Sequence, residues 1–183
     1  HLMPKKGWLN DPNGLVYFKG EYHIFYQADE ENLLGHVNKA WGHYSTKDFI
    51  TYKRHELAIL PNSIYDKNGA YSGSAIVKDD VLYLFYTGNV KHEGNHDYIT
   101  SGREHNLMRV ESKDGIHFTN KVCLLKNEDY PSDCTNHVRD PKIFVKEGLY
   151  HLVLGARLLD NTSRVLEYIS NDLNTWTYTR RYT

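Results

Sequence analysis

The sequence has little of what would indicate a disulfide scaffold, a zinc module or a membrane protein. Its two cysteines, Cys123 and Cys134, are not separated by any common zinc-ligand spacing. We expect both to be free thiols, as is typical of a reducing cytosol. The apolar runs fall far short of the roughly 20 residues that a transmembrane helix needs, and no signal-peptide pattern is present. Since the first residue is His1 and not Met, the true N-terminus is expected upstream.

Neither sign of charge is in excess. The 183 residues include 22 Lys and Arg against 23 Asp and Glu, for a net charge of −1. The sequence therefore gives no electrostatic reason to expect nucleic acid or an anionic membrane as a partner. No stretch is long and periodic enough to predict a helix. Tyrosine is abundant, with 15 residues, which favours β-strands and sugar-contacting surfaces.

Three segments follow one pattern, in which two strands are joined by a tight turn. They cover residues 15–27, 75–87 and 142–155, with turns at 19–21, 79–80 and 146–148. The second strand of each pair is rich in β-branched and aromatic residues, which are typical of strands. The chain is therefore expected to be all-β.

A second pattern recurs after each of these segments. A hydroxyl residue is followed by an Asp two positions on and by an aromatic residue four positions later. The three copies are Thr46-Asp48-Tyr52, Ser112-Asp114-Phe118 and Ser170-Asp172-Trp176. The Asp predicts a loop between an inner and an outer strand, with the aromatic ring packed beneath it. Four strands per unit and a period of about 60 residues predict β-propeller blades, over about residues 10–60, 70–125 and 138–183.

Two Asp-Pro pairs carry the chemistry. Residues 8–14, Trp-Leu-Asn-Asp-Pro-Asn-Gly, place Asp11 between an amide and a proline, directly before a strand pattern. Pro12 lacks a backbone N–H and pushes Asp11 toward an extended conformation. Asp140-Pro141 also stands before a strand pattern. Two carboxylates presented alike suit the cleavage of a glycosidic bond, although a turn or cap Asp is the commoner use of Asp-Pro.

Five segments together resemble glycoside hydrolase family 32, which contains invertases, fructan hydrolases and sucrose-6-phosphate hydrolases. They are residues 8–14, 25–27 (Phe-Tyr-Gln), 41–43 (Trp-Gly-His), 71–74 (Tyr-Ser-Gly-Ser) and 139–141 (Arg-Asp-Pro), in the family's order. The resemblance implies a five-bladed β-propeller followed by a β-sandwich. Residues 1–183 would then supply about three blades of an N-terminal catalytic propeller, and the remaining blades and the sandwich would lie outside them.

The resemblance also implies roles for individual residues. Asp11 would be the nucleophile that attacks the anomeric carbon of a fructosyl unit, with retention of configuration. Asp140 would stabilise the oxocarbenium-like transition state, and Arg139 would keep Asp140 ionised by lowering its pKa. Asn10 would hydrogen-bond the substrate. The side chains expected to line the sugar site are Gln27, Trp41, Tyr71 and Ser72. For Trp41, stacking on a sugar and packing in the core are both open.

Two features depart from the family. The family commonly continues after Gln27 with an aromatic-Asn-Pro run, whereas residues 28–31 here are Ala-Asp-Glu-Glu, which would remove an apolar wall near the pocket. The family's acid/base Glu, in a Glu-Cys block, would fall just beyond Thr183. Glu167 lies too early and is followed by Tyr168. Without a proton donor and a closed ring, residues 1–183 alone are expected to be inactive and to associate.

One rival motif is present. Residues 92–96, His-Glu-Gly-Asn-His, fit the zinc-protease pattern, which requires a helix so that both histidines face one way. Gly94 and the nearby Gly88 and Gly102 instead favour a solvated loop. We therefore expect no metal, and the family resemblance implies no cofactor.

The sequence thus predicts a retaining β-fructofuranosidase acting on sucrose 6-phosphate or sucrose. Residues 65–74 and 85–90 look most like the bacterial sucrose-6-phosphate hydrolases, which are cytoplasmic and act on sucrose phosphorylated during import. One alternative is a fructan hydrolase of the levanase or inulinase type. Another is a noncatalytic sugar-binding propeller fragment, which the missing Glu would favour. The expected partner is a small-molecule sugar, and no Lys/Arg cluster in the sequence identifies a phosphate site.

Overall fold

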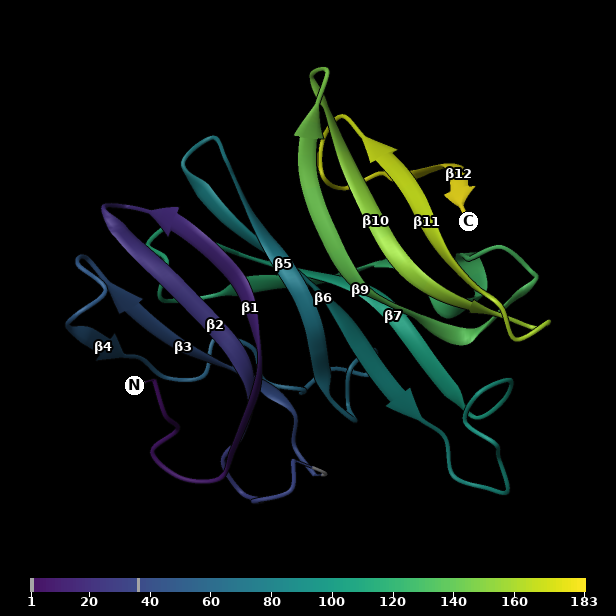
Figure 1. Cartoon of the computed structure of the whole chain (residues 1–183), viewed down its shortest axis with the longest axis horizontal. Coiled ribbons are helices and arrows are strands. Elements are labelled where there is room, and N and C mark those ends of the chain that lie inside the picture. Colours follow the sequence, from purple (N-terminus) through teal and green to yellow (C-terminus); the bar gives the residue numbers. More distant parts are fainter. Residues whose placement is uncertain (1, 36) are drawn as a thin grey trace.

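The computed structural model describes residues 2–35 and 37–183, and within them the chain folds into three four-stranded antiparallel sheets (Figure 1). The first sheet contains β1 (Trp8–Phe18), β2 (Glu21–Asp29), β3 (Ala40–Thr46) and β4 (Tyr52–Arg54). The second contains β5 (Ala70–Lys78), β6 (Val81–Lys91), β7 (Arg103–Ser112) and β8 (Thr119–Leu125). The third contains β9 (Cys134–Lys146), β10 (Leu149–Leu158), β11 (Ser163–Ser170) and β12 (Thr177–Tyr182). A single 3-10 turn, η1 (Asn127–Asp129), is the only helical element in these ranges.

Each sheet is a meander that starts with its innermost strand. β1 lies beside β5, and β5 lies beside β9, so the three first strands meet where the sheets converge (Figure 1). This arrangement confirms the all-β prediction and its three four-stranded units. The number of blades in a complete ring stays a prediction. Among the described residues there is no helix of the length and apolar character needed to cross a bilayer.

The first two strands of each sheet are joined by a two-residue turn. Its central residues are Lys19-Gly20, Asp79-Asp80 and Glu147-Gly148, and all six have positive φ between 50° and 84°. Two successive positive φ values define the turn whose twist matches that of an antiparallel hairpin. The three turns lie at the positions expected from the sequence.

The recurring hydroxyl–Asp pattern forms the loop between the third and fourth strands of each sheet. In the third sheet Ser170 Oγ donates to Asp172 Oδ1 at 3.0 Å, and that oxygen also accepts the backbone N–H of Thr175 at 2.8 Å. Thr46-Asp48 and Ser112-Asp114 make the equivalent contacts. A short polar side chain that binds its own backbone replaces the missing ladder bonds of a tight loop.

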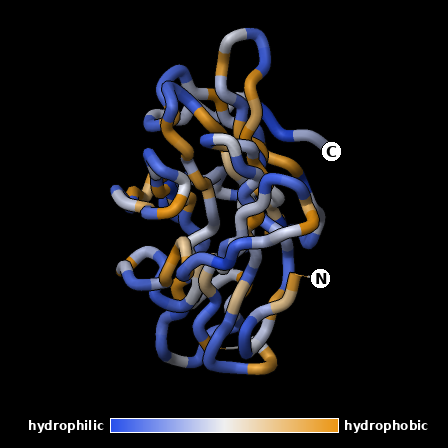
Figure 2. The backbone as a smooth tube through the Cα atoms, turned by 90° about the vertical axis from the view of Figure 1, so that its left-hand side faces the viewer, coloured by the Kyte–Doolittle hydropathy of each residue, from blue (hydrophilic) through white to orange (hydrophobic). Residues whose placement is uncertain are grey.

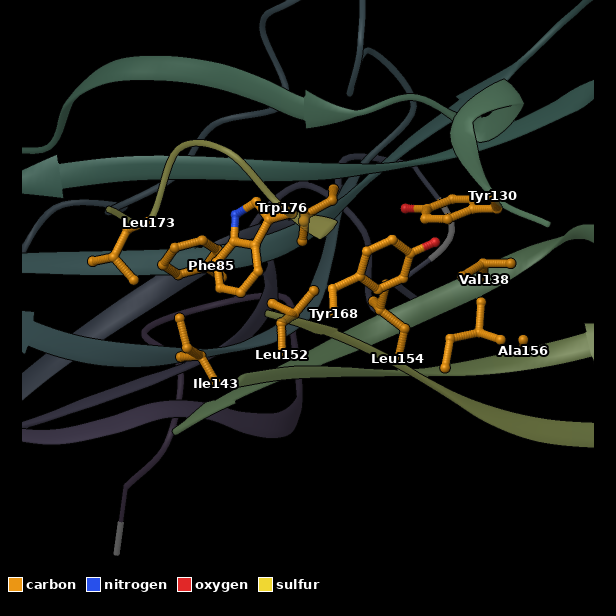
Figure 3. Packing of buried hydrophobic residues seen from close by; sticks show 12 residues of the cluster. Phe85, Tyr130, Val138, Ile143, Leu152, Leu154, Ala156, Tyr168, Leu173 and Trp176 are labelled. Atoms are coloured by element: carbon orange, nitrogen blue, oxygen red, sulfur yellow. The ribbon is translucent and has the colours of Figure 1, made fainter. Parts of the chain in front are cut away.

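Apolar side chains from neighbouring sheets form the core between them. Along the chain, hydrophobic and hydrophilic stretches alternate over short distances, as expected for half-buried strands (Figure 2). Between the second and third sheets, Phe85 meets Trp176 edge to face, with ring centroids 5.8 Å apart, and Leu152 and Leu166 are fully buried in the same cluster (Figure 3). Burial of this kind is the main favourable contribution to folding.

The rival motif at residues 92–96 lies in the loop after β6, as predicted. Four of its five residues are exposed, and His92 Nε2 lies 2.7 Å from Glu104 Oε1. No group of three or more His, Cys, Asp or Glu is placed to hold a metal in residues 2–35 and 37–183. Cys123 and Cys134 are free thiols, and burial raises the pKa of each to about 11.

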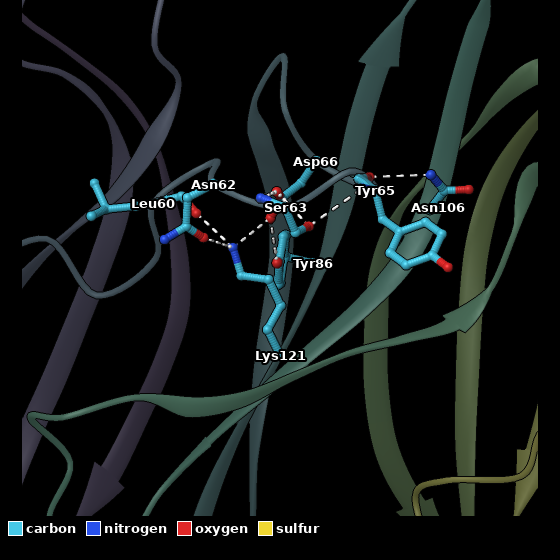
Figure 4. A network of polar contacts seen from close by, with 8 residues as sticks. All are labelled: Leu60, Asn62, Ser63, Tyr65, Asp66, Tyr86, Asn106 and Lys121. Atoms are coloured by element: carbon cyan, nitrogen blue, oxygen red, sulfur yellow. Dashed lines mark hydrogen bonds and ion pairs between the residues drawn. The ribbon is translucent and has the colours of Figure 1, made fainter.

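A buried carboxylate fixes the segment that connects the first sheet to the second (Figure 4). Asp66 is fully buried and accepts hydrogen bonds from Ser63, from the Tyr86 hydroxyl at 2.8 Å and from Lys121 Nζ at 2.7 Å. Lys121 also donates to the carbonyl of Leu60 at 2.6 Å. A buried charge must be paired in this way, because an unpaired one carries a large desolvation cost. The network holds the residues that lead directly into β5.

We predict that Lys121→Met destabilises the protein. The methionine keeps the apolar stem but leaves Asp66 without its cation, which should lower the free energy of unfolding by about 2 kcal/mol. Urea denaturation followed by fluorescence measures this, with Lys113→Met on an exposed loop as the control. Equal urea midpoints for the two variants would contradict the role assigned to the network.

Imidazole rings stack on one another in the first sheet. His23 Nδ1 and His43 Nε2 share a hydrogen bond at 2.9 Å. The His43 ring stacks on Phe25 and on His55, with centroids 4.3 and 4.4 Å apart. Burial, reinforced by the charges of His55 and His23, lowers the pKa of His43 to about 2. In the second sheet, burial and the charge of His137 lower the pKa of His105 to about 2.

These histidines should make stability fall below pH 6.5. In that range the unfolded chain binds protons that the folded protein excludes, so each such His costs about 1.4 kcal/mol per pH unit. Urea midpoints should therefore change little from pH 7.5 to about 6.5 and decrease from there to pH 5.0. His43→Phe keeps a stacked ring but removes one titrating site, so its midpoint should depend less on pH. An identical slope for both proteins would rule out His43 as a contributor.

Candidate active site

Each of the three innermost strands carries a β-bulge. In β1, Asn10 pairs with Gln27 and Pro12 pairs with Tyr26, which leaves Asp11 without a partner. An unpaired bulge residue turns its side chain away from the ladder, and bulges are common next to active sites. Asp11 is accordingly exposed although its strand continues on both sides.

The same irregularity recurs in β5 and β9. In β5, Tyr71 and Gly73 are paired with successive residues of β6, so Ser72 is skipped. In β9, Asp140 and Pro141 stand where the partner strand has one residue, between the pairs of Arg139 and of Lys142. Asp11, Ser72 and Asp140 thus occupy equivalent positions in three consecutive sheets.

The position of both carboxylates differs from the one expected. We predicted that Asp11 and Asp140 begin their strands, but β1 already starts at Trp8 and β9 at Cys134. Proline ends a strand only where its missing N–H would have been needed by a neighbour. Here the bulge places the proline where the ladder is already interrupted, so the strand runs through.

Hydrogen bonds between the innermost strands bring the bulges together. Ser72 Oγ donates to Asp11 Oδ2 at 2.9 Å, which joins β5 to β1. The backbone N–H of Asp140 donates to Thr87 Oγ1 at 2.9 Å, and Ser74 Oγ donates to the carbonyl of Pro141 at 2.7 Å. These last two bonds join the second sheet to β9.

Asp140 is held in an unusual conformation. Its φ is +61°, in the left-handed region that non-glycine residues rarely adopt. Such conformations persist where the surroundings enforce them, and they concentrate at active sites. The side chain borders a pocket of about 600 Å³ together with Arg139 and residues of β10, β11 and β12.

The pKa of Asp140 shifts in the direction opposite to the one expected. Partial burial raises this pKa, and the nearby charge of Asp11 raises it further. Arg139, whose Nε lies 3.7 Å from Asp140 Oδ2, acts to lower it but does not outweigh the other two effects. Our expectation that Arg139 would lower this pKa overlooked both the desolvation of the carboxylate and its like-charged neighbour.

Two residues expected to line the sugar site are instead buried beneath it. Trp41 has no exposed surface and packs on Phe25 and Tyr86, so the structure corrects its stacking role to core packing. Its indole Nε1 donates to the carbonyl of Tyr71 at 3.0 Å. Gln27 is 3% exposed and donates to the carbonyl of Ala70 at 2.9 Å. Both side chains position the first residues of β5 from below.

The other expected residues lie around the two carboxylates. Asn10 and Arg139 directly precede Asp11 and Asp140 in their strands, and both are exposed. Tyr71 is half-buried, and burial raises its pKa. Ser72 is the residue that contacts Asp11 directly.

Asp29 anchors a loop, a role that no sequence motif indicated. This side chain is fully buried and accepts the backbone N–H groups of Glu31, Asn32, Val37 and Asn38 at 3.0 to 3.1 Å. Burial alone would raise the pKa of Asp29, but these four hydrogen bonds outweigh it and lower the pKa. Residues 28–31, which we expected to remove an apolar wall near the pocket, therefore contain the anchor of the loop that leads to β3.

Glu167 lies apart from the bulges and is fully engaged. Its carboxylate accepts from His151 Nδ1 at 2.9 Å and from the Tyr182 hydroxyl at 3.0 Å, and it pairs with Arg180 Nε at 2.8 Å. Burial would raise the pKa of Glu167, but these partners outweigh it and lower the pKa. A general acid needs a raised pKa, so Glu167 is a structural residue.

The innermost strands of three propeller-type sheets thus expose two carboxylates, the pair of groups that suits glycosidic bond cleavage. The family model described as Glycosyl hydrolases family 32 N-terminal domain matches residues 1–183. The chain therefore belongs to glycoside hydrolase family 32, as its sequence motifs predicted.

Individual relatives agree with this membership. The chain is 42% identical to a sucrose-6-phosphate hydrolase of Bacillus subtilis over 97% of its own length and 35% of the relative's. Among solved structures, it superimposes on a sucrose-6-phosphate hydrolase from Lactobacillus gasseri with a TM-score of 0.86 and 34% identity, over 97% of this chain and 35% of that one. For a family 32 β-fructofuranosidase of Bombyx mori the TM-score is 0.84 and the identity 32%, over 98% of this chain and 36% of that one. The chain thus spans about a third of the length of the relatives it matches.

The conformation of Asp140 gives a stability prediction that is independent of activity. At a positive φ, an L-residue with a Cβ is less favourable than glycine by about 1–2 kcal/mol. Asp140→Gly should therefore be more stable than Asp140→Ala by that amount, as measured by urea denaturation. Equal midpoints would show that the left-handed conformation at this bulge carries no strain.

Proposed function

We propose that the protein containing this chain is a retaining β-fructofuranosidase that hydrolyses sucrose 6-phosphate or sucrose. The observation that carries this proposal is the meeting of Asp11 and Asp140 at equivalent bulges, with Ser72 bound to Asp11. Membership of family 32 and 42% identity to a sucrose-6-phosphate hydrolase support it.

Asp11 acts as the nucleophile. The Ser72 hydroxyl holds Asp11 Oδ2, so the other carboxylate oxygen is oriented to attack the anomeric carbon of the fructosyl unit. The bond from this carbon to the leaving-group oxygen breaks as the new ester bond forms. Water then cleaves the ester and releases fructose, which restores the carboxylate. Two displacements at one carbon retain its configuration.

Asp140 stabilises the charge that develops between these steps. The transition state resembles an oxocarbenium ion, which a fixed carboxylate favours more than it favours the neutral substrate. The second sheet holds the β9 bulge, because the N–H of Asp140 donates to Thr87 Oγ1 in β6 and Ser74 Oγ in β5 donates to the carbonyl of Pro141, so little reorganisation is needed. We assign Asn10, Tyr71 and Arg139, which surround the carboxylates, to contacts with the sugar.

The proton for the leaving group requires a third carboxyl group. Glu167 is excluded by its partners, and we propose that the acid/base Glu lies outside residues 1–183, together with the remaining blades and a β-sandwich. In a retaining enzyme it should come within about 5–5.5 Å of Asp11. Residues 1–183 alone should then lack activity.

Sucrose-6-phosphate hydrolases among the relatives, at 38 to 42% identity, favour a phosphorylated or free sucrose substrate over a fructan. We also propose a cytoplasmic location, because Cys123 and Cys134 are both free thiols and disulfides are uncommon in that reducing compartment.

The test is the hydrolysis of sucrose and sucrose 6-phosphate by the full-length protein. Asp11→Asn should reduce kcat by about 10⁴-fold, as expected when a nucleophile is removed. Asp160→Asn, on the exposed turn between β10 and β11, is the matched control and should leave the rate unchanged. NMR of the first fructose released should show the β-anomer. Initial release of the α-anomer, or normal turnover by Asp11→Asn, would disprove the mechanism.

A further inference from the structure

Two cations face each other where β6 ends and β7 begins. Lys91 is paired directly with Arg103 across the two strands. Like charges in this position destabilise a sheet, whereas opposite charges would stabilise it. Both cations lie against the ring of Tyr98, at 5.7 and 5.9 Å from its centroid. The pair is therefore held in place by an aromatic face and not by a carboxylate.

A third cation reaches the same region from the first sheet. Lys39 Nζ lies 5.4 Å from the Trp8 ring centroid and 4.9 Å from that of Tyr71. Cation–π contacts on two sides restrict this long side chain to one region. Burial lowers the pKa of Lys39, the charge of Asp11 acts to raise it, and Lys91 and Arg103 lower it further. The three cations are thus close enough to repel one another.

None of these three cations is in a direct ion pair in the part of the chain that the structure describes. Within residues 2–35 and 37–183, the side chains of Lys39, Lys91 and Arg103 form neither an ion pair nor a hydrogen bond with a protein side chain. Arg103 Nε is buried and has no hydrogen-bond partner. Basic residues elsewhere in the protein, such as Lys121 and Arg181, do have carboxylate partners. Positive charge that the protein gathers but does not neutralise attracts an anion.

A pocket of about 160 Å³ lies at this cluster and is lined by Lys39, Asn68, Tyr71 and Lys91, with Gly35 and Val37 at its side. Asn68 Oδ1 accepts the backbone N–H of Lys91 at 2.7 Å, which fixes the amide and leaves its NH₂ group to donate. The pocket therefore offers two ammonium groups and an amide donor, with the Arg103 charge beside them. Tetrahedral oxyanions need several donors of this kind.

We propose that this pocket binds the phosphoryl group of a phosphorylated disaccharide whose glycosidic bond lies at Asp11. The inference rests on the proposed function, since the same Tyr71 that lines the pocket directly precedes Ser72, the hydrogen-bond donor to Asp11. A phosphate held here and a sugar held at the bulges would belong to one substrate molecule. Lys39 and Lys91, with the charge of Arg103 beside them, then distinguish sucrose 6-phosphate from sucrose.

Calorimetric titration of the full-length protein tests the phosphate pocket. The Asp11→Asn background prevents turnover, and the probes are sucrose 6-phosphate and sucrose. Lys91→Gln should lower the ratio of the two affinities about tenfold, and adding Arg103→Gln should lower it further, because Lys91 lines the pocket and Arg103 contributes positive charge beside it. Lys113→Gln, on an exposed loop of the same sheet, is the control and should keep the ratio. An unchanged ratio in the double variant would overturn the inference.

Turnover separates this inference from the proposed function. If the wild-type protein hydrolyses both sugars while the double variant keeps the original ratio of affinities for sucrose 6-phosphate and sucrose, the pocket assignment fails and the enzymatic proposal stands. If neither sugar is hydrolysed but the double variant loses affinity for sucrose 6-phosphate, the pocket stands and the enzymatic proposal fails. Thermal unfolding without ligand checks the fold, and because the substitutions remove repulsion, the variants should melt no lower than wild type.

Discussion

Contact between the innermost strands is the constraint on which the candidate site depends. Asp11, Ser72 and Asp140 come from three different sheets. Contacts within a single sheet therefore cannot set their positions relative to one another. The hydrogen bond from Ser72 to Asp11 and the bonds from Asp140 and Ser74 across to the neighbouring sheet fix their relative positions. Because each of the three is the extra residue of a β-bulge, its side chain is free of the ladder and points to the place where the sheets converge.

Buried polar groups support this arrangement from below. Gln27 and Trp41 donate to consecutive carbonyls at the start of β5, and Asp66 with Lys121 holds the segment that leads into it. Each of these groups is paired, as burial in a low-dielectric interior requires. A polar scaffold of this kind is directional, so it can set the position of a catalytic strand more narrowly than apolar packing can.

The arrangement of charges at this site lowers the stability of the folded protein. Burial and the nearby charge of Asp11 raise the pKa of Asp140, and three cations gather beside these carboxylates without a direct ion pair among the described residues. Asp140 also keeps a left-handed backbone conformation. None of these features favours the folded state, as expected if the proposed substrate brings complementary charge and hydroxyl groups. Sites that violate the usual rules of sequence and structure in this way are typically functional.

Sequence patterns were enough to predict the fold class, the hairpin turns, the recurring loops and the convergence of Asp11 and Asp140 on one region. These depend on local rules, since strand alternation, turn residues and Asp-Pro restriction act over a few residues. Three features became evident only from the packed sheets: the burial of Trp41 and Gln27, the raised pKa of Asp140, and the convergence of Lys39, Lys91 and Arg103. Burial and electrostatic interactions depend on distances through space, and residues far apart in the chain acquire those distances only when the sheets pack together.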